Sequence, residues 1–280
     1  EIVIHLAAQP LVRESYQRPK YTYETNVMGT VNILECIRKS NSVKSVVNVT
    51  TDKVYKNNEW VWGYRETDEL NGYDPYSNSK SCSELVTSSY KKSFFGKKEI
   101  SISTARAGNV IGGGDFAKDR IIPDCVRAAL SKTSIKVRNP FSIRPYQHVL
   151  EPLYSYLLIA ERQYKDINYS GSYNIGPNDT DCVNTGELVS RFCDKWEKII
   201  GIPQNWVDMS EDGPHEAQFL KLDATRFRTT FGKRPLWNIA ESLEKTIEWV
   251  NCYYFTKQNI SEFMGDQIKE YAGEFECLNR

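Results

Sequence analysis

Three Tyr-x-x-x-Lys pairs could each set a phenol and an ammonium group one helical turn apart: Tyr16/Lys20, Tyr76/Lys80 and Tyr253/Lys257. Residues four apart share a face only within a continuous helix. On such a face the lysine charge favours the phenolate, so the phenol can act as a general base. A free tyrosine has a pKa of about 10. To act as a base at neutral pH, its pKa must fall by roughly three units, which requires about 4 kcal/mol of electrostatic stabilisation of the phenolate.

Two of the pairs stand in unfavourable surroundings. Pro19 lies between Tyr16 and Lys20, and proline inside a helix removes a hydrogen bond and clashes with the preceding turn. We therefore expect these two residues on different faces. Tyr253 and Lys257 lie beyond the alternating strand and helix patterns, with no strand end nearby, so we expect them to serve packing or the surface.

Tyr76 and Lys80 belong to the stretch DPYSNSK, at the start of an expected helix. Asp74 suits the N-cap and Pro75 the first helical position. The helix follows a strand that ends at Thr51, and parallel α/β sheets bind ligands at the carboxyl ends of their strands. The helix N-terminus adds partial positive charge. Spacing and context leave a catalytic base and an ordinary helix start as alternatives.

Composition and charge limit the class of protein. Among 280 residues, 36 Lys and Arg balance 36 Asp and Glu, so no global field draws the chain to nucleic acid or to an anionic membrane. Seven cysteines without a Cys-x-x-Cys pair favour reduced thiols in a cytoplasm. Three histidines without ligand spacing predict no metal site. We expect no transmembrane helix and no signal peptide.

Strand and helix patterns alternate along the chain. This alternation predicts a parallel sheet with helices on both faces, and the absence of a long linker predicts that any second domain is interleaved with the first. In the first helix, Val27, Val31 and Leu34 are predicted to share one face. The expected strands are 1–8, 44–51, 99–110 and 172–177, and the expected helices are 18–41, 74 onward, 121–131, 149–163, 185–201 and 238–255.

Four motifs in order resemble the extended short-chain dehydrogenase/reductase family: HLAAQ, NVMGT, TTDKVY and YSNSK. The match covers most of the chain, and Thr51 precedes Tyr76 at about the separation that the family uses. The resemblance implies a Rossmann-like α/β fold that binds NAD, with a smaller interleaved α/β substrate domain. The dinucleotide-binding domain is expected at 1–110 and about 144–177, and the substrate-binding domain at about 111–143 and 178–280.

One departure from the family is large. The Gly-rich turn that cradles the cofactor pyrophosphate should precede HLAAQ, and it is absent from the sequence. GGGD at 112–115 follows Asn109 and lacks the G-x-x-G-x-x-G frame. A sheet that starts at EIVIHLAA exposes an unpaired apolar edge. We therefore expect that the first strands of the dinucleotide-binding domain are missing from this chain.

Within the family, the sequence is similar to the nucleotide-sugar 4,6-dehydratases. The triplet Thr51-Asp52-Lys53, with lysine in third place, resembles the branch that acts on CDP-glucose. The stretches 108–124, 144–153 and 214–223 point to the same branch. The resemblance implies an NAD-dependent lyase that converts CDP-D-glucose to CDP-4-keto-6-deoxy-D-glucose by oxidation at carbon 4, loss of water, and hydride return to carbon 6.

The resemblance also implies catalytic roles. Tyr76 takes the proton of the hydroxyl at carbon 4, Lys80 lowers the pKa of Tyr76, and Thr51 bonds the oxygen that becomes the ketone. Asp52 is the expected acid for the departing hydroxyl. Lys53 is the expected base at carbon 5, or it stays charged and stabilises the enolate. The alternative for Asp52 and Lys53 is an exposed ion pair in a loop.

Further residues are expected at the binding sites. Asn26 links the sheet to the active-site helix, and Ala7 and Ala8 allow close approach of NAD, which Tyr76 and Lys80 also contact. The residues expected to bind substrate are Asn109, Arg120 and Arg144; for His215 an ordinary loop histidine is an equal alternative.

The family commonly forms a homodimer through two helices on the flank of the sheet. Two other functions stay open: an epimerase or reductase of the same family, which needs no acid–base pair at 52 and 53, and a non-catalytic protein that senses a dinucleotide. Proteins of the latter kind usually lose the active tyrosine or lysine, and both are present here.

Overall fold

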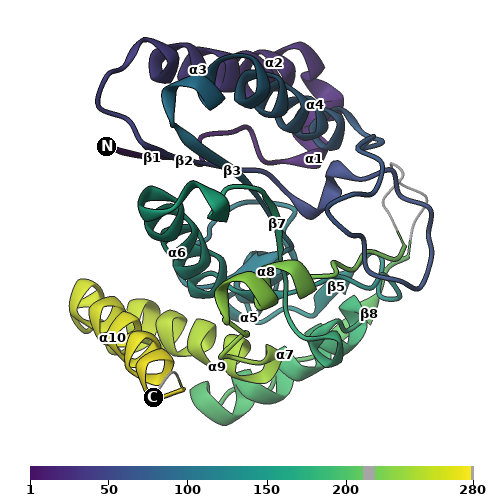
Figure 1. Cartoon of the computed structure of the whole chain (residues 1–280). Helices are drawn as coiled ribbons and strands as arrows, with labels where there is room; N and C mark the ends of the chain where they lie inside the picture. Colours follow the sequence, from purple (N-terminus) through teal and green to yellow (C-terminus); the bar gives the residue numbers. More distant parts are fainter. Residues whose placement is uncertain (211–217, 279–280) are drawn as a thin grey trace. The chain divides into compact units, whose positions relative to one another are not determined.

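The computed structural model describes residues 1–210 and 218–278, and the chain divides into two compact units (Figure 1). The first unit comprises Glu1–Gly108, Pro152–Gly176 and Pro214–Lys233. The second comprises Asn109–Glu151, Pro177–Gly213 and Arg234–Arg280. The second unit is therefore interleaved with the first.

A parallel four-stranded sheet forms the centre of the first unit. Its order is β1 (Ile2–His5), β2 (Ser45–Val49), β3 (Ser101–Ala107) and β7 (Ser172–Ile175). β3 is buried along its whole length, as a central strand covered on both faces must be. β1 lies at the edge of this sheet, and Ile2 is 49% exposed. The predicted parallel sheet is confirmed.

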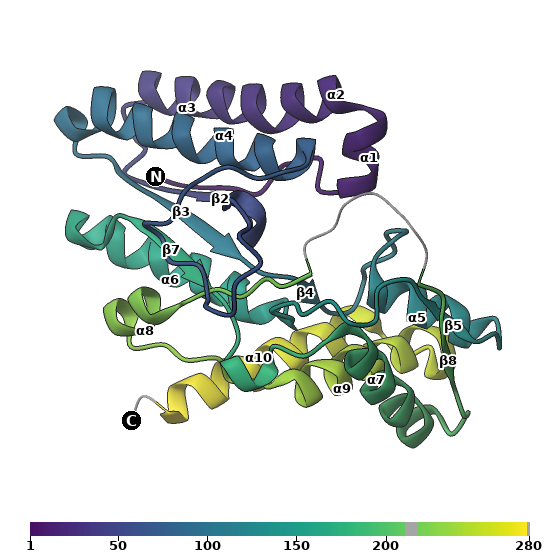
Figure 2. The same ribbon diagram turned by 90° about the vertical axis from the view of Figure 1, so that its right-hand side faces the viewer.

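Helices cover both faces of the sheet, and the strand side chains alternate between them. Val46 and Ile102 pack toward α3 (Gly29–Lys39), whereas Val47 and Ala105 pack with α6 (Leu150–Lys165). In Figure 2, α2 (Pro19–Tyr23) and α3 follow one another along one helical run above the strands, and α4 (Pro75–Tyr90) lies beside that run. Because successive side chains of a strand point to opposite faces of the sheet, neighbouring residues contact different helical layers.

The predicted first helix runs from Pro19 to Lys39 as α2, a π-helical segment (Glu24–Met28) and α3. Of the three residues predicted to share one face, Leu34 is buried, whereas Val27 and Val31 are half-buried. The polar positions Thr22, Asn26 and Thr30 are buried instead, because they bond the loop after β1 and the serines of α4.

Shorter elements complete the first unit. They are α1 (Val12–Gln17), a 3-10 turn (Asp52–Val54), a π-helical segment (Lys91–Phe95), two more 3-10 turns (Gly96–Lys98 and Ile167–Tyr169) and α8 (Thr225–Phe231).

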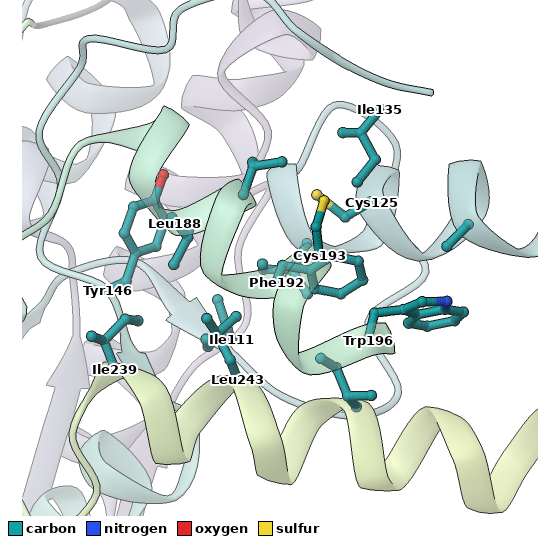
Figure 3. Packing of buried hydrophobic residues seen from close by; sticks show 14 of the residues in the cluster. Ile111, Cys125, Ile135, Tyr146, Leu188, Phe192, Cys193, Trp196, Ile239 and Leu243 are labelled. Atoms are coloured by element: carbon teal, nitrogen blue, oxygen red, sulfur yellow. The ribbon is translucent and has the colours of Figure 1, made fainter. Parts of the chain in front are cut away.

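The second unit has its own apolar core. α7 (Thr185–Ile200), capped by Gly201 at φ +78°, packs against α9 (Ile239–Val250). Figure 3 shows Leu243 of α9 close to Ile111, and Ile239 of α9 and Phe192 and Trp196 of α7 belong to the same apolar cluster. The remaining elements are β4 (Val110–Ile111), α5 (Ile121–Leu130), β5 (Ile135–Val137), β6 (Gln147–His148), a 3-10 turn (Asp179–Asp181), β8 (Trp206–Asp208), a π-helical segment (Asn251–Thr256) and α10 (Ile260–Leu278).

Apart from one or two residues at the other boundaries, the expected domains differ from these units at two segments. Residues 144–151 belong to the second unit, because β6 pairs with β4 and because the Glu151 carboxylate accepts hydrogen bonds from the backbone of Leu236 and Trp237. Residues 218–233 belong to the first unit, because α8 packs on β7 and the Asp223 carbonyl accepts a hydrogen bond from Asn174.

Among the described residues, no helix has the length and apolarity to cross a membrane. Within the same part of the chain, no group of three His, Cys, Asp or Glu residues could hold a metal ion.

Candidate active site

The N-terminus of α4 places a tyrosine and a lysine on one face. The Asp74 carboxylate accepts a hydrogen bond from the Ser77 backbone at 3.0 Å, and Pro75 is the first helical residue. The helix continues without interruption to Tyr90, so Tyr76 and Lys80 lie one turn apart. Tyr76 is 9% exposed and Lys80 is 7% exposed, so both belong to the interior of the first unit.

The other two Tyr-x-x-x-Lys pairs do not form such a face. Tyr16 lies in α1, which ends at Gln17, and Lys20 lies in α2, which begins at Pro19. Tyr253 lies in a π-helical segment, and Lys257 follows it with a left-handed backbone at φ 50°. Only the pair in α4 combines a continuous α-helix with burial.

The end of β2 carries the triplet that the sequence analysis singled out. Thr51 caps the 3-10 turn: its hydroxyl donates to Asp52 Oδ1 at 2.9 Å and accepts from the Lys53 backbone at 3.4 Å. Asp52 is 1% exposed, whereas Lys53 is half-buried. A carboxylate this deeply buried does not fit the alternative of an exposed ion pair in a loop.

Lys80 connects α4 to this strand end. Its Nζ donates to the Val49 carbonyl oxygen at 3.1 Å. Burial lowers the pKa of Lys80 from 10.5 to about 8, and the charge of Glu84, one turn further along α4, acts in the opposite direction. An ammonium group has three N–H donors, and within the described residues Lys80 has this one acceptor. A buried cation with donors to spare fits the hydroxyl groups of a ribose.

Asn26 joins the loop after β1 to α4. Its side chain accepts from the Gln9 backbone N–H at 2.8 Å and donates both to the Gln9 carbonyl and to Ser79 Oγ. This is the link that the sequence analysis expected of Asn26. In the same loop, Ala7 is exposed and Ala8 is half-buried, and both have small side chains at the carboxyl end of β1.

Three of the expected substrate-binding residues lie in the second unit. The Asn109 carbonyl accepts from the Gln147 backbone beside β4 and β6, and its side chain is half-buried. Arg120 stands before α5 and forms an ion pair with Asp115 at 3.0 Å. Arg144 is buried, at 5% exposed, and its guanidinium donates to the Ile143 carbonyl. His215 lies outside the described residues.

A buried ion pair that was not predicted from the sequence lies beside the end of β2. Arg106 in β3 donates from Nε and Nη2 to the two carboxylate oxygens of Glu84 in α4, both at 2.9 Å. The two side chains are 3% and 2% exposed. The sequence held one signal: an arginine within the buried strand ISISTARA requires an ionic partner.

A parallel sheet covered by helices on both faces, with Tyr76 and Lys80 one turn apart beside the end of β2, defines an extended short-chain dehydrogenase/reductase. A profile of the GDP-mannose 4,6 dehydratase family matches residues 1–246, and the chain belongs to this family of nucleotide-sugar dehydratases. The resemblance described from the sequence is therefore confirmed.

The chain is 45% identical over 277 residues to a CDP-glucose 4,6-dehydratase of Salmonella typhimurium strain LT2, and the match covers 94% of this chain and 76% of that protein. Two solved structures share the fold. UDP-glucose 4-epimerase of Thermotoga maritima, solved with UDP-glucose, has a TM-score of 0.78 at 22% identity and covers 90% of this chain and 78% of its own. dTDP-glucose 4,6-dehydratase of Bacillus anthracis, solved with NAD, has a TM-score of 0.73 at 21% identity, and the match covers 90% of this chain and 73% of that protein.

Proposed function

We propose that this protein is an NAD-dependent hydro-lyase that converts CDP-D-glucose to CDP-4-keto-6-deoxy-D-glucose. The observation that carries the proposal is the hydrogen bond from Lys80 to Val49, which sets the Tyr76 face of α4 beside the strand end that bears Thr51. The 45% identical CDP-glucose 4,6-dehydratase supports the choice of sugar nucleotide.

The residues proposed to hold NAD fit that group. Ala7 and Ala8 have small side chains at the carboxyl end of β1, Lys80 has donors for ribose hydroxyls, and Asn26 fixes the loop between them. When bound, NAD supplies the hydride acceptor for carbon 4 of the sugar and the hydride donor for carbon 6.

At carbon 4, the phenolate oxygen of Tyr76 takes the hydroxyl proton. The Lys80 cation on the same helical face stabilises the phenolate, and the helix N-terminus adds to this effect. The Thr51 hydroxyl bonds the oxygen that becomes the ketone. The ketone then acidifies the hydrogen at carbon 5.

Loss of water across carbons 5 and 6 requires an acid and a base. Asp52, buried beside Thr51, is proposed to protonate the departing hydroxyl. Lys53, one residue further and half-buried, is proposed to take the proton from carbon 5. Their places in one 3-10 turn would present both side chains to neighbouring carbons of one sugar.

Substrate binding is assigned to the second unit and cofactor binding to the first. Asn109 and Arg144 are proposed to hold the diphosphate, because a guanidinium matches phosphate oxygens in a forked geometry. Arg120 is a weaker candidate for the same task, because Asp115 already neutralises part of its charge.

A homodimer in the cytoplasm is the proposed form of the protein. α3 and α4 lie side by side on the flank of the sheet, and apolar side chains on or beside them are exposed: Met28 at 50%, Leu85 at 55% and Phe94 at 42%. A Leu85→Glu variant that sediments at the same mass as the parent protein would count against this surface.

The six described cysteines are free thiols, as a reducing compartment favours.

The test incubates the purified full-length protein and NAD with CDP-glucose and, in parallel, with dTDP-glucose, and follows the keto product optically. Conversion of CDP-glucose with loss of water supports the proposal, and conversion of neither sugar rejects it. Epimerised sugar with no loss of water would instead identify an epimerase, which needs neither Asp52 nor Lys53.

A further inference from the structure

Three side chains of α4 hold the end of β2 and the segment that follows it. Lys80 donates to the Val49 carbonyl at 3.1 Å. Glu84 Oε1 accepts a hydrogen bond of 2.5 Å from the Thr50 hydroxyl. Ser81 Oγ donates to the Val54 carbonyl at 2.7 Å. These contacts lie on both sides of residues 51–53, so their geometry depends on α4.

Glu84 is the charged member of this set, and Arg106 orients it. Two parallel N–H donors from one guanidinium fix the plane of the Glu84 carboxylate, and Thr50 occupies Oε1 as well. Arg106 is fixed in turn: its Nη1 donates to Tyr55 Oη at 2.8 Å, and Tyr55 donates to Asn174 Oδ1 at 2.6 Å. The carboxylate is thus tied to β2, β3 and β7.

We propose that Glu84, oriented by Arg106, is a positioning residue for the dehydratase reaction. Through Thr50 it sets the place of the following triplet relative to Tyr76. Through its charge it keeps the neighbouring Lys80 in the cationic form. This inference rests on the proposed function in the tasks that it gives to Lys80, to Tyr76 and to the triplet 51–53.

The charge effect follows from the surroundings of Lys80. Burial favours the neutral amine, and the Glu84 carboxylate at i+4 opposes this. Other charged or titratable groups on elements that pack against α4 include His5 from β1, Tyr23 from α2, Asp52 and Lys53 from the 3-10 turn, and Arg106 from β3; α1 adds Arg13, Glu14 and Tyr16, and the π-helical segment after α2 adds Glu24. Of the groups identified as acting on the pKa of Lys80, Glu84 alone favours the cation.

The first experiment measures the titration of Lys80 by NMR in protein with 13C-labelled lysine, with the signal assigned from a Lys80→Met variant. Glu84→Gln keeps the shape of the side chain but removes its charge. We expect the titration midpoint of Lys80 to fall by about one pH unit or more, the usual scale for a close charge. An unchanged midpoint overturns the charge effect.

Glu35→Gln is the matched control. Glu35 also forms a bidentate pair with an arginine, Arg38, with both distances at 2.8 Å, and it accepts a hydrogen bond from Tyr90 at the far end of α4. This variant should leave the midpoint of Lys80 unchanged. An equal fall in both variants overturns the inference, because it identifies a general response to loss of a carboxylate.

A double variant covers the case in which Glu84→Gln does not fold. Glu84→Gln/Arg106→Met removes both charges and leaves no unpaired guanidinium in the interior. The midpoint of Lys80 should still lie below that of the parent protein. A midpoint equal to the parent value overturns the charge effect here too.

The second experiment tests positioning with CDP-glucose turnover. Thr50→Val removes the hydrogen bond to Glu84 but no charge, so kcat should fall about tenfold with KM and the Lys80 midpoint unchanged, and Thr50→Ser should restore kcat. Unchanged kcat in Thr50→Val overturns the positioning role. If the parent protein converts no sugar nucleotide, the proposed function fails, while the NMR comparison still tests the charge effect.

Discussion

Lys80 of α4 and Val49 of β2 are joined by a hydrogen bond of 3.1 Å from the ammonium Nζ to the carbonyl oxygen. The bond holds a buried cation one helical turn from Tyr76 and two residues from Thr51 along the backbone that it contacts. Of the three Tyr-x-x-x-Lys motifs in the sequence, this is the one that lies on a continuous α-helix with both side chains buried, and it is the one to which we assign proton transfer.

Tyr76→Phe tests the proposed base. Loss of a positioned base typically lowers turnover by a hundredfold or more, and we expect that decrease in kcat with CDP-glucose while the circular dichroism spectrum is unchanged. Tyr253→Phe is the matched control, because Tyr253 begins another Tyr-x-x-x-Lys motif but is 46% exposed. Similar rates in the two variants would contradict the assignment.

Lys80→Met should inactivate the enzyme yet stabilise the fold. The pKa of Lys80 is about 8 in the native protein against 10.5 in the unfolded chain, so burial of the cation costs about 3 kcal/mol of stability. The variant avoids this cost but loses the hydrogen bond to Val49, which is worth about 1 kcal/mol. We therefore expect its free energy of unfolding to be about 2 kcal/mol higher than that of the parent protein. The unfolded chain binds this proton more tightly than the native protein does. The stability gained by the variant is therefore complete below pH 8 and disappears as the pH rises to 10.5. Urea unfolding at pH 7 and pH 10.5 measures it.

The activity of the parent protein should fall on the alkaline side. Tyr76 needs the Lys80 cation, and half of that cation is lost at a pH of about 8 in the free protein. A plot of kcat/KM for CDP-glucose against pH should therefore bend downward near pH 8. A profile that stays flat to pH 10 would exclude Lys80 as the group that maintains the phenolate.

Lys53→Met tests the base at carbon 5. Elimination should stop, and turnover should fall by a hundredfold or more, because this proton transfer has no other proposed acceptor. Lys56→Met serves as the control, since Lys56 lies three residues further and pairs with Glu69 at the surface. Full turnover in Lys53→Met would leave the carbon 5 base unassigned and would favour a different residue.

Gly113→Ala should destabilise the second unit. A Cβ atom at position 113 would lie 2.0 Å from Trp249 Cγ, so the indole must move. We expect a loss of about 1–3 kcal/mol, the range for overpacked interiors. Gly265→Ala in α10 meets nothing within 4 Å and should be neutral or slightly stabilising. Thermal unfolding of both variants makes the comparison, and equal melting temperatures would contradict it.

Local sequence signals predicted the elements well where one residue type decides the backbone. Pro19 and Pro75 each begin a helix, Asp74 caps α4, and Gly201 ends α7. These signals depend only on residues a few positions apart, so they can be recognised in the sequence without the structure. They placed Tyr76 and Lys80 on one face of a helix before any tertiary contact was known.

The helical run 19–39 shows where such signals stop. The hydrophobic period predicted one face with Val27, Val31 and Leu34, but Asn26 and Thr30 are buried as well because Ser79 and Ser83 of α4 supply their hydrogen bonds. A polar residue is buried when a distant partner satisfies it, and no local pattern specifies that partner.

The sequence by itself determined the parallel α/β architecture and the helix that carries Tyr76 and Lys80, and it predicted the residues that could do chemistry. Only the tertiary structure decided that Glu84 meets Arg106, that Lys80 meets Val49, and that residues 218–233 return to the first unit. The physical reason is range: caps and periodicity act between neighbours along the chain, whereas a buried charge takes its partner from whichever strand the fold brings beside it.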